Sequence, residues 1–165
     1  MPVLRQNLAK ERMDDTMTAQ DNVALVRSLF DLYNSNQSDP AWLDKSVASV
    51  SEDLELVDTP SGRTLHGRDA YKQFVLFFAE GFPGSSTEIT NVFATEDQVA
   101  VEFVGRGTNT GPLHMPTGDI PPTGGKLELR FCQVLGIKNG KLVSFHSYYD
   151  VMTMLQQLGL VQMQE

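Results

Sequence analysis

Four side chains that can donate or accept protons occupy every second position of one segment near the end of the chain: Ser144, His146, Tyr148 and Asp150. Alternate residues of a β-strand face the same side of a sheet, so a strand here would place all four on one surface. Hydroxyl, imidazole and carboxylate groups in that arrangement can move protons or bind the polar groups of a ligand. This segment is therefore the first candidate site, either for acid–base chemistry or for binding.

A predicted hairpin supplies the neighbours of these residues. Asn139-Gly140 separates two strand-like runs, residues 126–138 and 141–149, and is a preferred sequence for a two-residue turn. Such a turn places Lys138 opposite Lys141, and the same register places Gln133 opposite His146. It also predicts the pairs Ile137 with Leu142, Leu135 with Ser144, Phe131 with Tyr148 and Leu129 with Asp150. A face that mixes large apolar residues with these polar groups is typical of a ligand pocket.

The other face of the predicted hairpin is also apolar. The register assigns Val134, Val143, Phe145 and Tyr149 to it. Because a surface of this kind is unfavourable in water, we expect it to be covered by a second copy of the chain. The sequence therefore predicts a homodimer, whatever the function of the pocket.

Simpler roles are available for the same residues. A single histidine on a strand is usually a structural, hydrogen-bonded residue, and Tyr148 and Phe131 could serve packing alone. Asp150 directly precedes a predicted helix over residues 151–158, where an aspartate commonly caps the free N–H groups. The three histidines of the chain, His66, His114 and His146, show no zinc-site spacing, so no metal site is predicted. These observations leave acid–base chemistry without a cofactor, or binding alone.

Composition limits the class of protein. With 165 residues, 41% of them hydrophobic, the chain is expected to form one domain over residues 21–165, preceded by an N-terminal arm over residues 1–20. A net charge of −8 opposes binding to nucleic acid or to anionic membranes. The single cysteine, Cys132, and the absence of an apolar leader sequence predict a cytoplasmic protein.

The remaining elements predict an α+β domain. Val26, Leu29, Phe30 and Tyr33 recur at helical spacing after an expected N-cap at Asp21-Asn22. A second helix is expected after Pro40, with Trp42 and Val50 packed on the first, and a third from His66-Gly67 to Gly81. A period of two predicts strands at residues 89–93 and 99–104, and the Gly- and Pro-rich residues 105–125 are expected to form a long functional loop.

Three segments resemble the SnoaL-like polyketide cyclase and ester cyclase family. They are HGRDAY (residues 66–71), GTNTGPLHMPTGDIPPTGGKLEL (107–129) and NGKLVSFHSYYDVMTMLQQLGLV (139–161). The resemblance implies a cone-shaped α+β barrel of the nuclear transport factor type, shared with ketosteroid isomerase. In this barrel a curved antiparallel sheet is covered by about three N-terminal helices and followed by a short C-terminal helix. It also implies a pocket between helices and sheet, and frequent dimerisation.

The resemblance also implies site residues. The aspartate before the last helix, which is the acid–base residue in the cyclases, matches Asp150. Two features depart from the family pattern: His146 replaces the usual tryptophan, and the cyclase strand histidine has no counterpart near Gln133.

We therefore predict a cofactor-independent acid–base enzyme that acts on a hydrophobic, carbonyl-bearing small molecule. Asp150 is expected to transfer the proton, and His146 and Tyr148 to bind the oxyanion. The residues expected to contact the substrate are Gln133, Phe131 and Leu129, with Tyr33, Trp42, Asp58 and His66 as weaker candidates at the rim. The alternatives are a non-catalytic small-molecule-binding module and a homodimeric interaction protein with a vestigial pocket.

Overall fold

The computed structural model describes residues 17–162, and most of the predicted N-terminal arm lies outside them. The helices are α2 (Ala19–Asn34), α3 (Trp42–Val47), α4 (Arg68–Gly81) and α5 (Val151–Gln157), and a 3₁₀ turn, η1, spans Thr59–Ser61. The strands are β1 (Val50–Asp58), β2 (Arg63–His66), β3 (Ser86–Ala94), β4 (Gln98–Thr108), β5 (Leu113–Met115), β6 (Gly118–Ile120), β7 (Lys126–Lys138) and β8 (Lys141–Tyr149).

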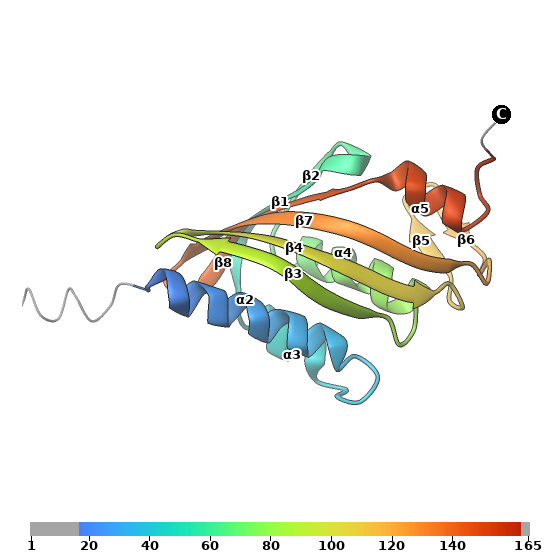
Figure 1. Ribbon diagram of the computed structural model, residues 1–165. Coiled ribbons are helices and arrows are strands. Elements are labelled where there is room, and N and C mark those ends of the chain that lie inside the picture. Colours follow the sequence, from blue (N-terminus) through green and yellow to red (C-terminus); the bar gives the residue numbers. More distant parts are fainter. Residues whose placement is uncertain (1–16, 163–165) are drawn as a thin grey trace, which may run out of the picture.

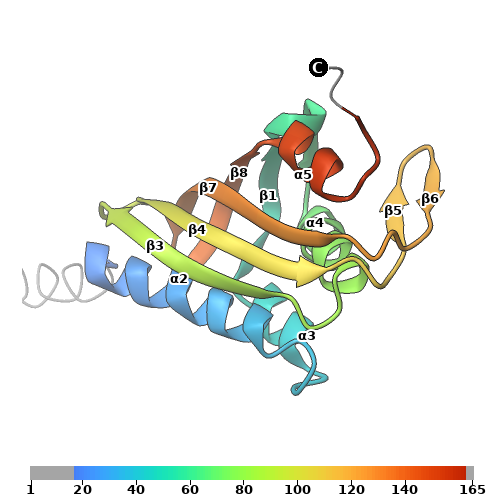
Figure 2. The same ribbon diagram turned by 45° about the vertical axis from the view of Figure 1, so that its right-hand side comes forward.

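Six strands form one curved sheet in the order β2-β1-β8-β7-β4-β3 (Figure 1). All neighbouring strands are antiparallel except β1 and β8, which run parallel, so the sheet is mixed. Helices α2, α3 and α4 lie on one face of the sheet, which we call the inner face, and α5 lies near the beginning of β7 (Figures 1 and 2). The predicted α+β cone, with three helices before the main run of strands and a short one after it, is confirmed.

The first helix begins slightly earlier than predicted. Thr18, rather than Asp21 or Asn22, is its N-cap, and the side chain of Asp21 in turn accepts a hydrogen bond from the Thr18 backbone at 2.9 Å. This reciprocal arrangement is a capping box. The predicted helix over α3 is confirmed, but Val50 lies in β1. No helix between residues 17 and 162 is long and apolar enough to cross a membrane.

The hairpin between β7 and β8 has the predicted turn but a different register. Asn139 and Gly140 both have positive φ, 51° and 70°, as a type I′ turn requires, and Lys138 pairs with Lys141. The register then shifts between Gly136 and Ile137, because Val143 is an extra residue in β8. On the side of the shift that is further from the turn, Gly136 pairs with Ser144, Val134 with His146 and Gln133 with Ser147. The predicted pairing of Gln133 with His146 is therefore wrong.

This bulge exchanges the two faces of β8. Phe145 is 4% exposed and packs edge to face against Tyr71 and Phe74 in the core. Tyr149 also lies on the inner side, in contact with Phe78 and Phe131. The predicted apolar outer face consequently keeps Val134 and Val143 but loses its two aromatic members.

Residues 105–125, predicted to be one long loop, include parts of three strands. The end of β4 occupies the first positions, and β5 and β6 then form a separate two-stranded arm beside α4 (Figure 2). Asn109, which is fully buried, holds the base of this arm with four side-chain hydrogen bonds, to Gly81, Gly111 and, twice, Thr123. The arm is thereby fixed to the C-terminal end of α4.

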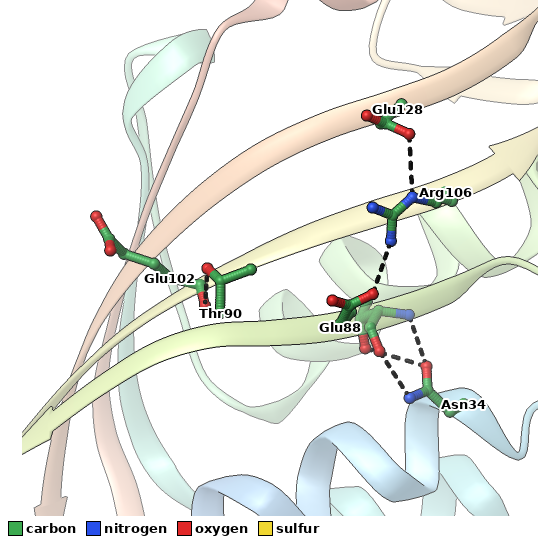
Figure 3. A network of polar contacts seen from close by, with 7 residues as sticks. Asn34, Glu88, Thr90, Glu102, Arg106 and Glu128 are labelled. Carbon is green, nitrogen blue, oxygen red and sulfur yellow. Dashed lines mark hydrogen bonds and ion pairs between the residues drawn. The ribbon is translucent and has the colours of Figure 1, made fainter.

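An ion-pair network crosses three strands on the outer side of the sheet (Figure 3). Arg106 of β4 contacts Glu88 of β3 at 3.1 Å and Glu128 of β7 at 3.0 Å. Asn34, the last residue of α2, bonds to the backbone and the hydroxyl of Thr87 on β3. These contacts join α2 and the three strands at one end of the sheet.

Candidate functional site

Two cavities lie between the helices and the inner face of the sheet. The larger, of about 640 Å³, is bounded by α4, β1, η1, β2, α5 and the β5–β6 arm. The smaller, of about 90 Å³, lies between α2, α4 and strands β4, β7 and β8. Phe74 and Phe78 of α4 contribute to the walls of both, so these two rings separate them. Most other wall residues are apolar, and the few polar ones therefore stand out as candidates for chemistry.

A row of three polar residues crosses the inner face of adjacent strands. Asp58 of β1 pairs with Ser147 of β8, which pairs with Gln133 of β7. Asp58 lines the larger cavity and Gln133 the smaller one, while Ser147 lies between them and is fully buried. The sequence placed Asp58 and Gln133 among the candidates but did not identify Ser147 or their alignment.

This row has unused hydrogen-bonding capacity. Oδ1 of Asp58 and Oγ of Ser147 are buried and have no hydrogen-bond partner among the described residues. Asp58 immediately precedes η1, yet its side chain makes no capping hydrogen bond to that turn. Because an unpaired buried polar atom costs free energy, such atoms are commonly retained for a bound ligand or water.

Tyr149 adds a phenol to the wall of the larger cavity, which Asp58 also lines. Its hydroxyl lies beside the Asp58 carboxylate, although the two do not reach ordinary hydrogen-bond geometry. Burial, together with the negative charge of Asp58, raises the pKa of Tyr149 well above its usual range. Tyr149 is therefore protonated at neutral pH and can donate a hydrogen bond. A carboxylate and a phenol at one apolar cavity can remove a proton from a ligand and stabilise the anion that forms.

His146 and Tyr148, two of the residues predicted to be catalytic, lie on the outer side of the sheet. Nε2 of His146 is 3.2 Å from Oε1 of Glu55 on β1, and Tyr148 is 44% exposed. Neither residue lines the two cavities. The placement predicted for them was wrong because the Val143 bulge turns both side chains away from the helices.

Asp150 caps α5. Its Oδ1 accepts hydrogen bonds from the backbone of Met152 at 2.9 Å and of Thr153 at 3.2 Å, and its Oδ2 accepts one from the Thr153 hydroxyl at 2.7 Å. These bonds lower the pKa of Asp150, and the carboxylate is exposed. Asp150 also lies outside both cavity walls. The capping role considered from sequence is present, and the catalytic role stays a prediction.

The other predicted contacts divide between core, cavity and surface. Phe131 lines the smaller cavity and stacks on Phe103 at 4.8 Å, whereas Leu129 is a core residue outside both cavity walls. Tyr33 also lines the smaller cavity; its hydroxyl is 2.7 Å from Oγ of Ser85, and burial raises its pKa to about 12.

Trp42 and His66 lie outside the site. Trp42 is buried against Tyr33, with ring centroids 5.7 Å apart, and lines neither cavity. His66 pairs across strands with Glu55 and is exposed on the outer side. Of the four residues proposed for the rim, Asp58 and Tyr33 therefore reach a cavity.

Charged groups also form part of the wall of the larger cavity, among them Glu80 and His114. His114 of the β5–β6 arm lies 2.9 Å from Asp119 through Nδ1 and 3.3 Å from Glu80 of α4 through Nε2. Its hydrogen bond with Asp119 and the two negative charges raise the pKa of His114. Within residues 17–162, no three His, Cys, Asp or Glu side chains are grouped as a metal site would require.

Comparison with known proteins gives the family. The model of SnoaL-like polyketide cyclases matches residues 14–158, which is most of the chain. No curated protein sequence matches.

Solved structures confirm the fold. A protein from Jannaschia sp. CCS1, described as a SnoaL-like polyketide cyclase, superimposes with a TM-score of 0.74 at 19% identity over 88% of this chain and 96% of that one. IdmH from Streptomyces antibioticus, described as a polyketide cyclase, superimposes with a TM-score of 0.62 at 24% identity over 83% of this chain and 97% of that one. A protein with a ketosteroid isomerase-like fold from Catenulispora acidiphila superimposes with a TM-score of 0.63 at 20% identity over 83% of this chain and 93% of that one. Since the family model matches most of the chain and these structures share its fold, the chain belongs to the SnoaL-like polyketide cyclase family.

Proposed function

We propose that this protein is a cytoplasmic, cofactor-independent acid–base enzyme that acts on a hydrophobic, carbonyl-bearing small molecule in the larger cavity. Asp58 removes a proton from the carbon next to the carbonyl group, and Tyr149 donates a hydrogen bond to the enolate oxygen. The enolate then takes a proton at another carbon or forms a carbon–carbon bond, as in an isomerisation or an intramolecular aldol closure. Membership of a polyketide cyclase family supports this class of reaction.

The observation that supports this proposal most strongly is the unpartnered Oδ1 of Asp58 beside the Tyr149 hydroxyl. A carboxylate used for structure would normally be paired or would cap η1, and Asp58 does neither within the described residues. The wall around it is formed largely by Leu56, Phe74, Phe77 and Met154, which suit an apolar substrate. Ser147, the partner of Asp58 on the neighbouring strand, is expected to position the carboxylate.

The test compares binding and turnover in the same variants on a panel of β-keto esters, cyclic ketones and hydrophobic ketones that bear a carboxylate. Asp58→Asn should lower turnover at least about 100-fold while ligand affinity changes little, since an amide keeps the shape but cannot accept the proton. Tyr149→Phe should also lower turnover, because the oxyanion loses a donor. Asp53→Asn, an exposed carboxylate on the same strand, is the control and should leave turnover unchanged.

Two outcomes contradict the proposal. Full turnover by Asp58→Asn would exclude Asp58 as the base. Ligand binding by the wild type without turnover of any panel member would instead indicate a binding module of the same fold.

A further inference from the structure

Arg63 stands directly opposite Asp58. It is the first residue of β2, and the antiparallel register pairs it with Asp58, the last residue of β1. Leu65, two residues further along β2, packs against the core, so Arg63 is on the same inner side of the strand. Both residues form part of the wall of the larger cavity. The guanidinium and the proposed base therefore lie at the same end of one cavity.

The charge of Arg63 is not neutralised within the described chain. No carboxylate of residues 17–162 lies within 4.0 Å of its guanidinium, and this includes the neighbouring Asp58. Arg106 contacts two glutamates and Arg68 contacts Glu52. Within residues 17–162, Arg27 and Arg130 also form no ion pair, but they line neither cavity. The other cationic side chain of this cavity, His114, is already engaged by two carboxylates. In a chain with a net charge of −8, an uncompensated arginine at a cavity is available to a ligand.

The surroundings favour a carboxylate over a phosphate. A guanidinium binds a carboxylate through two parallel hydrogen bonds, so one arginine is sufficient. A phosphate dianion needs more donors, and the cavity wall contains no lysine and no second arginine. Asp58 and Glu80, which lie on the same wall, would also repel a dianion more strongly than a monoanion.

We infer that the substrate is a hydrophobic ketone that also bears a carboxylate, and that Arg63 binds this carboxylate. This inference rests on the proposed function and adds the substrate class. Because Arg63 faces Asp58 across the β1–β2 pair, the reacting carbon lies near the acidic end of the substrate. The apolar remainder extends along the phenylalanines of α4 toward Met154. Arg63 is thus a specificity-determining residue that selects acids over esters.

The test measures binding of three small probes by calorimetry at low ionic strength: cinnamate, methyl cinnamate and phenyl phosphate. Wild type should bind cinnamate more tightly than either of the others. Arg63→Gln should weaken cinnamate binding about tenfold or more, as expected for a lost charge-assisted pair, and leave methyl cinnamate nearly unchanged. Arg130→Gln, an exposed arginine of β7 that lines neither cavity, is the matched control and should alter none of the three affinities.

Retained cinnamate affinity in Arg63→Gln, or no cinnamate binding by the wild type, would overturn the inference. Tighter, Arg63-dependent binding of phenyl phosphate would overturn the choice of carboxylate. These outcomes are distinct from failure of the proposed function, which would appear as full turnover in Asp58→Asn.

Discussion

Replacing Asn109 by alanine is expected to release the β5–β6 arm from α4. The amide is fully buried and makes four hydrogen bonds: from Nδ2 to the carbonyls of Gly81 (2.8 Å) and Gly111 (2.9 Å), and to Oδ1 from the backbone (2.8 Å) and hydroxyl (2.9 Å) of Thr123. A net value of about 1 kcal/mol for each bond sets an upper figure near 4 kcal/mol. In the variant, water can replace the two bonds to the exposed Thr123 more easily than those to the buried carbonyls, which reduces the loss. We therefore expect the free energy of unfolding to fall by about 2–4 kcal/mol.

Gly111 lies where the backbone of the arm meets that of α4. A Cβ at this residue would lie 1.9 Å from the backbone oxygen of Glu80, so the two backbones are in close contact. Urea denaturation with a constant m-value provides the measurement. Asn91→Ala, which removes one exposed bond of 3.4 Å to Glu102, is the control and should change stability by less than about 0.5 kcal/mol. A loss below about 1 kcal/mol for Asn109→Ala would refute the reasoning, because it would mean that water replaces the amide.

Three further predictions concern the surface. The NMR titration midpoint of His114 should lie above the usual histidine pKa of about 6.5 and fall in Asp119→Asn. The contacts of His114 with Asp119 and Glu80 stabilise the fold at pH values below the unfolded-state pKa, and this contribution is lost as the pH rises through the folded-state pKa. Thermal or urea unfolding should show that Asp150→Ala is less stable than the wild type and that Asp150→Asn loses less stability, since asparagine is also a good N-cap. Sedimentation should give about twice the 18.3 kDa chain mass, since the outer face exposes Phe93 (65%); a monomer at micromolar concentration would contradict this.

The helices and the main hairpin could be predicted because their signals are local. The apolar spacing in α2 and α4 reflects one buried face, and Asn139-Gly140 accepts the positive φ values of its turn. The arm formed by β5 and β6 and the four-residue strand β2 were missed, since each is too short to show a period of two. They depend on contacts with α4 and β1 that are distant in sequence.

The candidate site was predicted on the wrong face of β8 because one extra residue, Val143, shifts the register of this strand. Val143 is a good strand former, so nothing in the local sequence distinguishes a regular strand from one with a bulge at that position. One signal was available in β1, where Leu54 and Leu56 are buried and Asp58 continues the same period of two. A carboxylate at a strand position that faces the core is unusual. It is a better indicator of function than a polar residue on an exposed face.

The central claim is that Asp58 accepts a proton from a carbon next to a carbonyl group. Hydrogen–deuterium exchange at that carbon of a hydrophobic cyclic ketone, such as tetralone, can be followed by NMR in deuterated buffer with wild type, Asp58→Asn and the Asp53→Asn control. We predict that wild type and Asp53→Asn accelerate the exchange well above the buffer rate, and that Asp58→Asn binds the ketone but loses at least about 100-fold of the acceleration. Equal acceleration by wild type and Asp58→Asn would contradict the claim.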